Sequence, residues 1–141
     1  METPRLGVVL DASAVIALLL EEPGAETVGV LLGSAEARMA TMNAAEVIDV
    51  LTRVRRGRPD TVIARIEELL STVVEPVVPS LELAIRAGEL RARNFRRDQR
   101  ISLADCFALA TAEPGDRIVT GDSTLASVAR DEGIETILLV P

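Results

Sequence analysis

Short apolar stretches typical of β-strands alternate along this chain with stretches whose apolar residues recur at helical spacing. Strands separated by helices require crossover connections, and crossovers produce a mostly parallel sheet that is covered on both faces. The pattern therefore predicts an α/β fold, a three-layer α/β/α sandwich, in a single domain over residues 1–141. The expected strands are 6–10, 38–41, 73–78, 117–120 and 136–140, and the expected helices are 13–21, 24–32, 44–51, 62–73, 81–95, 102–112 and 123–130.

Two details refine this arrangement. Pro76 and Pro79 lack the N–H that an inner strand needs, so the third strand is expected at an edge of the sheet. The helix over 81–95 carries an apolar stripe of Leu81, Ile85, Ala92 and Phe95. Charged residues occupy its other side, where Glu82–Arg86 and Glu89–Arg93 are spaced to form ion pairs on a solvated face.

The composition excludes several kinds of chemistry. The chain has no His, and all 15 basic residues are Arg, which removes a histidine base, a lysine Schiff base, a P-loop lysine and a histidine zinc ligand. Cys106 is the single cysteine, so an internal disulfide is impossible and a reducing compartment is expected. The apolar run 7–20 is too short to span a bilayer and contains Asp11, so we expect a cytoplasmic protein without a membrane segment.

Four acidic residues occupy similar places relative to the expected strands. Asp11 and Asp122 each follow a strand directly, whereas Glu46 and Asp105 lie about one turn into the helices that come after a strand. In a parallel sheet the carboxyl ends of all strands meet at one edge, and ligands bind there. The four carboxylates can therefore converge at that edge.

Each acid also has a local explanation. The segment at Asn43 resembles a helix capping box, Ser102 with Asp105 matches a looser form of that box, and Asp11 and Asp122 fit simple N-caps. Taken singly, the capping interpretation is favoured. The joint pattern favours a site, because the helix that Asp105 opens is nearly uncharged and an unpaired buried carboxylate is costly.

Carboxylates that meet in one pocket repel one another, which raises their pKa values or draws in a divalent cation. Oxygen ligands without His or Cys select hard ions such as Mg²⁺ or Mn²⁺. Such an ion suits hydrolysis of a phosphodiester, because it lowers the pKa of a bound water, orients the phosphate and stabilises the leaving oxygen.

Four segments in order carry a family resemblance: VLDASAVIALL around Asp11, NAAEV around Glu46, ISLADCFALATA around Asp105, and IVTGDSTL around Asp122. With these segments the chain resembles a PIN domain, and most closely the VapC-type ribonuclease toxins of prokaryotic toxin–antitoxin pairs. The resemblance implies an α/β/α sandwich with a parallel sheet of about five strands. It also implies Mg²⁺- or Mn²⁺-dependent endoribonuclease activity and inhibition by a small antitoxin protein.

The resemblance assigns roles to individual residues. Asp11 and Asp105 are expected to hold the metal ion, with Glu46 and Asp122 completing the site directly or through water. One of the latter two would orient or deprotonate the water that attacks RNA.

Other positions follow from the same match. Ser13 corresponds to the small hydroxyl residue after the first acid, and Thr120 to the threonine before the last acid. Both are expected to orient the carboxylates. Thr124 stands where some relatives carry a further acid, so the sequence does not decide whether the site holds one metal ion or two.

Two further positions are judged from the residues alone. Cys106 is expected to be a buried structural thiol and not a nucleophile, because the chain has no histidine to activate it. Asp49, one turn after Glu46, could approach the site, but a solvated surface acid is favoured.

Positive charge is concentrated locally although the net charge is −7. Arg96, Arg97 and Arg100 lie just before the Asp105 helix, where contact with the RNA backbone and a simple solvated surface are both open interpretations. The family commonly dimerises, and the apolar stripes that begin at Ala44 and Val62 fit either a homodimer face or ordinary core packing.

Other functions compete with this one. Dehalogenase-like hydrolases need a second Asp two residues after the first, where this chain has Ser13, and they and the response-regulator receivers both need a lysine. A PIN nuclease of RNA processing outside a toxin pair would look similar in sequence. A catalytically inactive, acidic α/β binding module is a further alternative, because all four acids could be caps.

Overall fold

The computed structural model describes residues 6–140, in which five parallel strands form one sheet in the order β3-β2-β1-β4-β5. The strands are β1 (Gly7–Leu10), β2 (Glu36–Ala40), β3 (Val74–Val77), β4 (Arg117–Thr120) and β5 (Glu135–Leu138). The helices are α1 (Ala12–Leu19), α2 (Ala25–Ser34), α3 (Thr41–Asp49) with its π-helical continuation η1 (Val50–Val54), α4 (Pro59–Thr72), α5 (Leu81–Asn94), α6 (Leu103–Thr111) and α7 (Ser123–Asp131). The parallel α/β fold is confirmed, and β3, which contains Pro76, is an edge strand as predicted.

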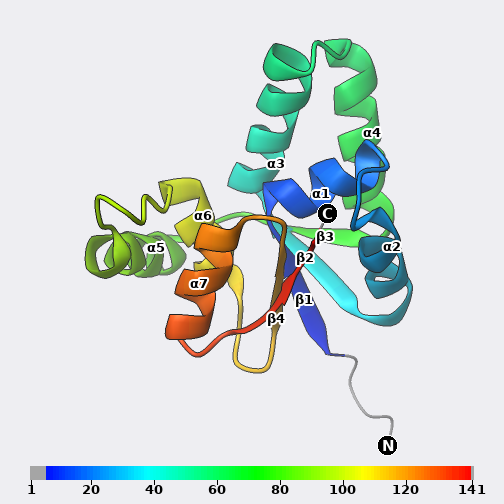
Figure 1. Cartoon of the computed structure of the whole chain (residues 1–141). Helices are drawn as coiled ribbons and strands as arrows, with labels where there is room; N and C mark the ends of the chain where they lie inside the picture. Colours follow the sequence, from blue (N-terminus) through cyan, green and yellow to red (C-terminus); the bar gives the residue numbers. More distant parts are fainter. Residues whose placement is uncertain (1–5, 141) are drawn as a thin grey trace, which may run out of the picture.

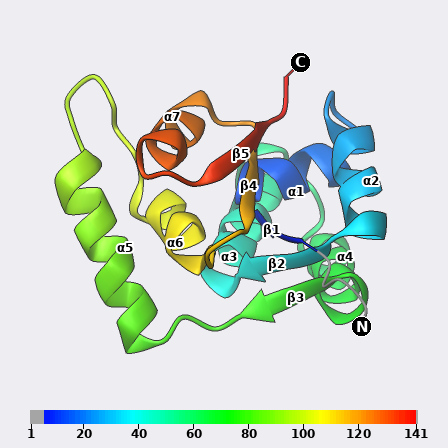
Figure 2. The same ribbon diagram turned by 90° about the horizontal axis from the view of Figure 1, so that it is seen from below.

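The sheet is covered on both faces because its strands are apolar on both sides. Along β1, Val8 and Leu10 pack into the core with α1–α4, whereas Val9 packs into a second core with α5–α7. Figures 1 and 2 show these two groups of helices on opposite sides of the sheet, which gives the predicted three layers. None of the helices in residues 6–140 combines the length and apolarity that crossing a bilayer requires.

The order in which strands are added to the sheet changes sides at β1. From β1 it moves outward through β2 to β3, and it then returns to β4 on the other side of β1. The carboxyl ends of β1 and β4 therefore flank a topological switch point, where crevices form in parallel sheets. In Figure 1, α3 and α4 project together beyond the body of the molecule.

Most residues of the apolar stripes on α3 and α4 are buried in the core on the α1–α4 side of the sheet, because the two helices pack against each other and α3 packs against α1: Ala44, Val47, Leu51, Val62, Ile66 and Leu69. Val73, at the end of the second stripe, is 47% exposed. Core packing therefore accounts for most of both stripes, and a homodimer stays a prediction.

The orientation of α5 differs from the expectation. Its buried residues are Ala87, Leu90 and Asn94, which pack on α6, while the stripe that includes Leu81 and Ile85 faces outward. The expected ion pairs within α5 are replaced by contacts to other segments. Arg93 pairs with Glu132 at the end of α7, and Arg86 donates to the carbonyl oxygen of Ala112.

Candidate functional site

Four acidic side chains from separate parts of the sequence line one pocket of about 140 Å³ at the carboxyl edge of the sheet. The acids are Asp11 after β1, Glu46 on α3, Asp105 on α6 and Asp122 after β4. The remaining lining residues are Ala12, Ser13, Ile16 and Val50. The four acids that the sequence placed at one edge of the sheet therefore do line the same pocket.

Asp11 is the most tightly held of the four. It is 2% exposed, and its Oδ1 caps α1 by accepting from the Ala14 N–H at 2.9 Å. The Ser13 hydroxyl donates to the same carboxylate from 2.7 and 2.8 Å, and the Thr120 hydroxyl donates to Oδ2 at 2.5 Å. Charge-assisted bonds of this kind fix the orientation of the carboxylate before any ligand arrives.

Ser13 and Thr120 also join the first acid to the last. The Gly121 N–H donates to the Ser13 hydroxyl at 2.8 Å, and the Asp122 N–H donates to the Thr120 hydroxyl at 2.9 Å. The two hydroxyl oxygens lie 3.2 Å apart. The ends of β1 and β4 are thus tied together by side chains that sequence reasoning had assigned to orienting the acids.

Asp105 and Asp122 act as helix caps as well as pocket residues. Ser102 and Asp105 form a complete capping box, in which the Asp105 N–H donates to the Ser102 hydroxyl at 3.0 Å. Asp122 Oδ1 accepts from the N–H groups of Thr124 and Leu125. Capping and convergence are therefore compatible, because the helices begin at the edge of the sheet where the pocket lies.

Asn43 is not a helix cap, which corrects the prediction. Helix α3 begins two residues earlier, at Thr41, so Asn43 lies in its first turn and is fully buried. Its Nδ2 donates to the Ala104 carbonyl oxygen at 3.0 Å, which holds α3 against the start of α6. The signal for this role is its spacing of three residues from Glu46, which places both on one helix face.

Burial and mutual repulsion both raise the pKa values of three of these acids. Burial raises the pKa of Asp11 to about 6, against the lowering effect of its hydrogen bonds. Burial is also the first cause of the raised pKa values of Glu46 and Asp105. The charge of Asp105 adds to the rise at Glu46, and the charge of Asp122 adds to the rise at Asp105. A cation among these carboxylates would stabilise their charged forms against both burial and mutual repulsion.

The donor set suits a hard divalent ion in its chemistry, since it offers carboxylate and hydroxyl oxygens only. In residues 6–140, however, no three acidic or cysteine side chains are already placed to bind a metal ion together. Direct ligation by Asp11 and Asp105, completed by Glu46 and Asp122, therefore stays a prediction.

Other residues singled out from the sequence lie outside the pocket. Cys106 is buried, and burial raises the pKa of its thiol to about 11, as suits a structural cysteine. Asp49 is exposed and forms a bidentate pair with Arg53, both contacts at 2.9 Å. Arg96, Arg97 and Arg100 are exposed in the connection between α5 and α6. The structure thus places these three arginines on the surface, and their contact with RNA stays a prediction.

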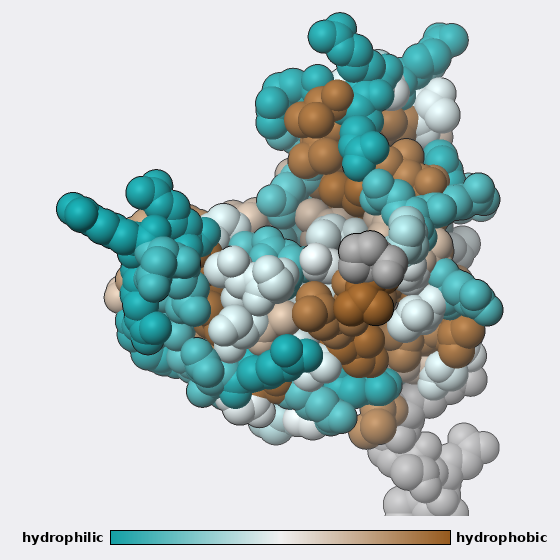
Figure 3. Space-filling view, in the orientation of Figure 1, coloured by the Kyte–Doolittle hydropathy of each residue, from teal (hydrophilic) through white to brown (hydrophobic). Residues whose placement is uncertain are grey.

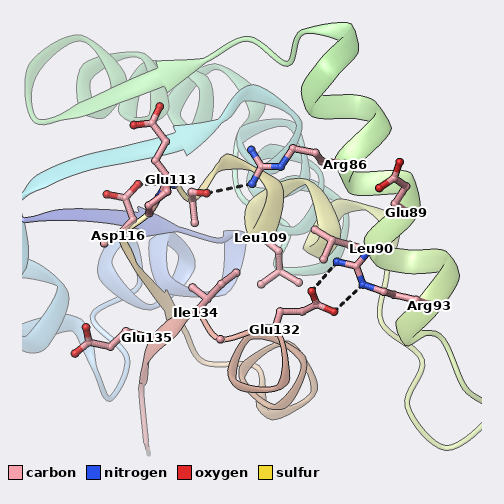
Figure 4. A pocket seen from close by; sticks show the side chains of 14 residues that line it. Arg86, Glu89, Leu90, Arg93, Leu109, Glu113, Asp116, Glu132, Ile134 and Glu135 are labelled. Carbon is pink, nitrogen blue, oxygen red and sulfur yellow. Dashed lines mark hydrogen bonds and ion pairs between the residues drawn. The ribbon is translucent and has the colours of Figure 1, made fainter.

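A larger cavity of about 480 Å³ lies at the opposite edge of the sheet, between α5 and the amino ends of β4 and β5 (Figure 4). It contains none of the four acids. Several of its charges are already paired, because Arg93 binds Glu132 through two contacts and Asp116 pairs with Arg38 on β2. This cavity offers no convergent set of catalytic groups, so the smaller acidic pocket is the candidate active site.

The fold and the pocket together define a parallel α/β protein with an acidic site at the switch point of its sheet. A family model described as PIN domain matches residues 8–136, a segment that contains all four acids. The chain therefore belongs to the PIN domain family, as its sequence motifs indicated. No curated protein sequence matches the chain.

Solved structures show the same fold at low sequence identity. VapBC from Salmonella typhimurium bound to DNA has a TM-score of 0.70 at 19% identity, with 96% of this chain and 99% of that chain covered. VapBC-1 from nontypeable Haemophilus influenzae has a TM-score of 0.68 at 20% identity, with 95% and 98% covered. VapC20 from Mycobacterium tuberculosis, described as a toxin that cleaves the sarcin–ricin loop, has a TM-score of 0.62 at 21% identity, with 94% and 89% covered.

Proposed function

We propose that this protein is a metal-dependent endoribonuclease that hydrolyses phosphodiester bonds of RNA, and that it is the toxin of a toxin–antitoxin pair. The observation that carries the proposal is the convergence of Asp11, Glu46, Asp105 and Asp122 on one pocket, with burial and mutual repulsion raising the pKa values of the first three. Carboxylates that are clustered and have raised pKa values, although this lowers the stability of the fold, are characteristic of active sites.

In this proposal Asp11 and Asp105 would hold a Mg²⁺ or Mn²⁺ ion. When bound, the ion would stabilise charge on the phosphate and lower the pKa of a water molecule. Ser13 and Thr120 keep the Asp11 carboxylate in place by donating to it. Glu46 is only partly buried and its pKa is raised, so its carboxylate is suited to accept a proton from the attacking water.

An acidic pocket repels RNA, so the approach of the phosphate needs positive groups nearby. Helices α1, α6 and α7 begin at this edge, so the positive ends of their dipoles lie toward the pocket. Arg96, Arg97 and Arg100 would add charge from the connection that leads into α6. None of the three forms an ion pair with another residue of the described part of the chain.

The antitoxin is inferred from the structural neighbours. Two of the solved structures with this fold are described as VapBC proteins, in one case bound to DNA. We infer that a small antitoxin protein binds this chain and inhibits it, and that the function resembles that of the VapC20 toxin in attacking RNA.

The test is cleavage of total RNA by the purified protein in Mn²⁺ or in EDTA. The parent protein should cut at defined sites in Mn²⁺ and not in EDTA. Asp105→Asn should lose at least about 100-fold in rate while it keeps its circular dichroism spectrum.

The matched control is Asp49→Asn, which removes an acid from the exposed side of the helix that carries Glu46. It should retain full activity. Equal cleavage by Asp105→Asn and the parent would refute the assigned site. Absence of cleavage by the parent, together with no stabilisation by Mn²⁺, would instead identify an inactive binding module whose acids act as caps.

A further inference from the structure

A cleft of about 190 Å³ lies where the end of α1 meets the projecting arm, residues 50–65, which consists of η1 and the first half of α4. Its apolar wall is formed by Leu19, Leu20, Leu51 and Val62. The other lining residues are Arg55, Gly57, Arg58, Thr61 and Arg65. Among residues 6–140 no acid lines this cleft, although the net charge of the chain is −7. The cleft therefore combines three positive charges with an apolar wall.

The tight turn between η1 and α4 shapes the cleft. Arg56 has a φ of 59°, in the left-handed region that non-glycine residues seldom adopt. The Gly57 N–H donates to the Leu51 carbonyl oxygen at 2.8 Å, and a Cβ atom added to Gly57 would lie only 2.9 Å from that oxygen. Glycine thus allows the chain to pass close to η1. This close passage brings Arg55 and Arg58, from the two sides of the turn, to one cleft.

The three arginines remain able to bind an anion. Arg55 pairs with Glu22 at 3.0 Å, and neither side chain is less than 35% exposed. Arg58 pairs with Asp60 at 3.6 Å, and both are largely exposed. Exposed ion pairs contribute only about 0–1 kcal/mol, so a phosphate group can compete for these arginines. Arg65 forms no ion pair with any residue in the described part of the chain.

The cleft adjoins the acidic pocket along two elements. At the base of the arm, Val50 lines the acidic pocket and the next residue, Leu51, lines the cleft. On α1, Ile16 lines the acidic pocket and Leu19 lines the cleft, a rise of about 4.5 Å along the helix. A nucleic-acid strand that enters the acidic pocket therefore reaches the cleft within a few nucleotides.

We propose that this cleft is a second RNA-binding subsite, in which Arg55, Arg58 and Arg65 bind backbone phosphates and the apolar wall receives an unstacked base. The inference rests on the proposed nuclease function, which makes RNA the ligand. A guanidinium group binds two phosphate oxygens at once and also stacks on the plane of a base. The chain has no Trp or Tyr and only two Phe, so arginine takes the place of the aromatic residues that usually stack on bases.

The location of the cleft favours an RNA strand over an acidic segment of a protein. The arm begins at the rim of the acidic pocket, so a strand that presents a phosphodiester to the four acids also meets the arm. In Figure 3 the arm, at the top of the view, shows apolar surface between long hydrophilic side chains. Phosphates and bases alternate along RNA, and the mixture of arginines with apolar side chains matches both parts.

The first experiment measures binding of a fluorescent RNA strand of about ten nucleotides in EDTA, by anisotropy over a range of salt concentrations. The test variant combines Arg58→Gln with Arg65→Gln. The matched control combines Arg86→Gln with Arg130→Gln, which removes the same charge elsewhere. Arg86 lines the cavity at the opposite edge of the sheet, and Arg130 lies in the last turn of α7, whose first turn is at the acidic pocket.

The parent should bind this RNA with a Kd in the micromolar range at about 0.05 M salt. The test variant should raise the Kd at least about 10-fold and reduce the slope of log K against log salt by about 1.4, or about 0.7 for each lost phosphate contact. The control should change the Kd less than about 3-fold and keep the slope, since it loses no phosphate contact. Unchanged thermal melting would show that the variants remain folded.

The second experiment tests the base and the kind of partner. An abasic strand of the same length keeps the phosphates, and it should bind the parent at least about 10-fold less tightly, because a bound base contributes about 1–3 kcal/mol. Equal binding of the two strands would overturn the assignment of a base to the apolar wall. An oligoglutamate of the same charge should bind less tightly than RNA. Tighter binding of oligoglutamate would identify an acidic protein partner and overturn the proposal.

Equal RNA affinities of the test variant and the control would also overturn it, as would a parent that binds no RNA at about 100 μM. These outcomes are separate from the fate of the nuclease proposal, because binding is measured without metal ions. Cleavage that requires Asp105, together with equal binding by both variants, would refute only the cleft. Binding that requires Arg58 and Arg65, without cleavage in Mn²⁺, would refute only the nuclease.

Discussion

Replacing Asp11 with Asn should make the metal-free protein more stable at neutral pH. Asp11 is 2% exposed, and burial raises its pKa from 3.8 to about 6 although Thr120, Ala14 and Ser13 donate hydrogen bonds to it. That rise is about 2 pH units at 1.36 kcal/mol each, so the ionised carboxylate lowers the free energy of unfolding by about 3 kcal/mol at pH 7.

The direction of the pH dependence follows from which state holds the proton. Below pH 3.8 the carboxyl group is protonated in the folded and the unfolded chain. Between 3.8 and about 6 the unfolded chain has released its proton while the folded chain keeps it, so the free energy of unfolding falls as the pH rises. Above about pH 6 the carboxylate is ionised in the folded chain as well, and the full reduction in the free energy of unfolding remains.

An asparagine at this position avoids the loss and keeps most of the hydrogen bonds. Its amide oxygen can still accept from the Ala14 N–H, and the hydroxyls of Ser13 and Thr120 can rotate to accept from its NH₂ group. The loss of charge-assisted bonds offsets part of the gain, which leaves an expected stabilisation of about 2 kcal/mol at pH 7.

The assay is urea unfolding of the parent and Asp11→Asn in EDTA between pH 4 and 8. The stability difference between the two should be small at pH 4 and should grow through pH 6. Added Mn²⁺ should then stabilise the parent and leave Asp11→Asn unchanged. A variant that is less stable than the parent at pH 7 in EDTA would refute the reasoning, because burial would then not be the dominant influence on Asp11.

Three further outcomes are expected. Thr120→Val should lower the unfolding free energy by about 1–3 kcal/mol in a urea titration, because the N–H of Asp122 loses its acceptor. Glu132→Gln should destabilise by about 1 kcal/mol at pH 7, since Arg93 holds the pKa of Glu132 at about 2, and the difference should vanish as the pH falls from 4.5 to about 2. Cys106 should resist thiol reagents at pH 8 in the native protein and react after unfolding, because burial raises its pKa to about 11.

Much of the fold could be predicted from local patterns. Each expected strand was found within two residues of its predicted bounds, because a short apolar run that ends in a turn or an acid has few other structures open to it. Pro76 located an edge strand because proline lacks a ladder donor. The start of α3 was missed by three residues, because Asn43 is a good capping residue in isolation but is needed in the helix to hold α6.

The orientation of α5 could not be predicted from spacing. The helix has apolar residues on two faces, and the stripe with the larger side chains was taken as the buried one. The structure buries Ala87 and Leu90 because α6 lies on that side, where the small side chain of Ala87 allows the two helices to pack closely. Glu132 likewise replaced Glu89 as the partner of Arg93, since distant segments compete with neighbours in sequence for the same charge.

The chain order of apolar runs, helical stripes and acids already specified a parallel α/β protein with carboxylates at one edge of its sheet. Those are consequences of short-range spacing and of the rule that parallel strands share a carboxyl edge. Three further properties depend on the tertiary structure alone. One pocket is lined by all four acids, Asp11, Glu46, Asp105 and Asp122. Burial raises the pKa of Asp11, and α5 turns an apolar stripe outward. Desolvation and contacts between remote segments depend on how the elements pack, and periodicity along a chain does not contain that information.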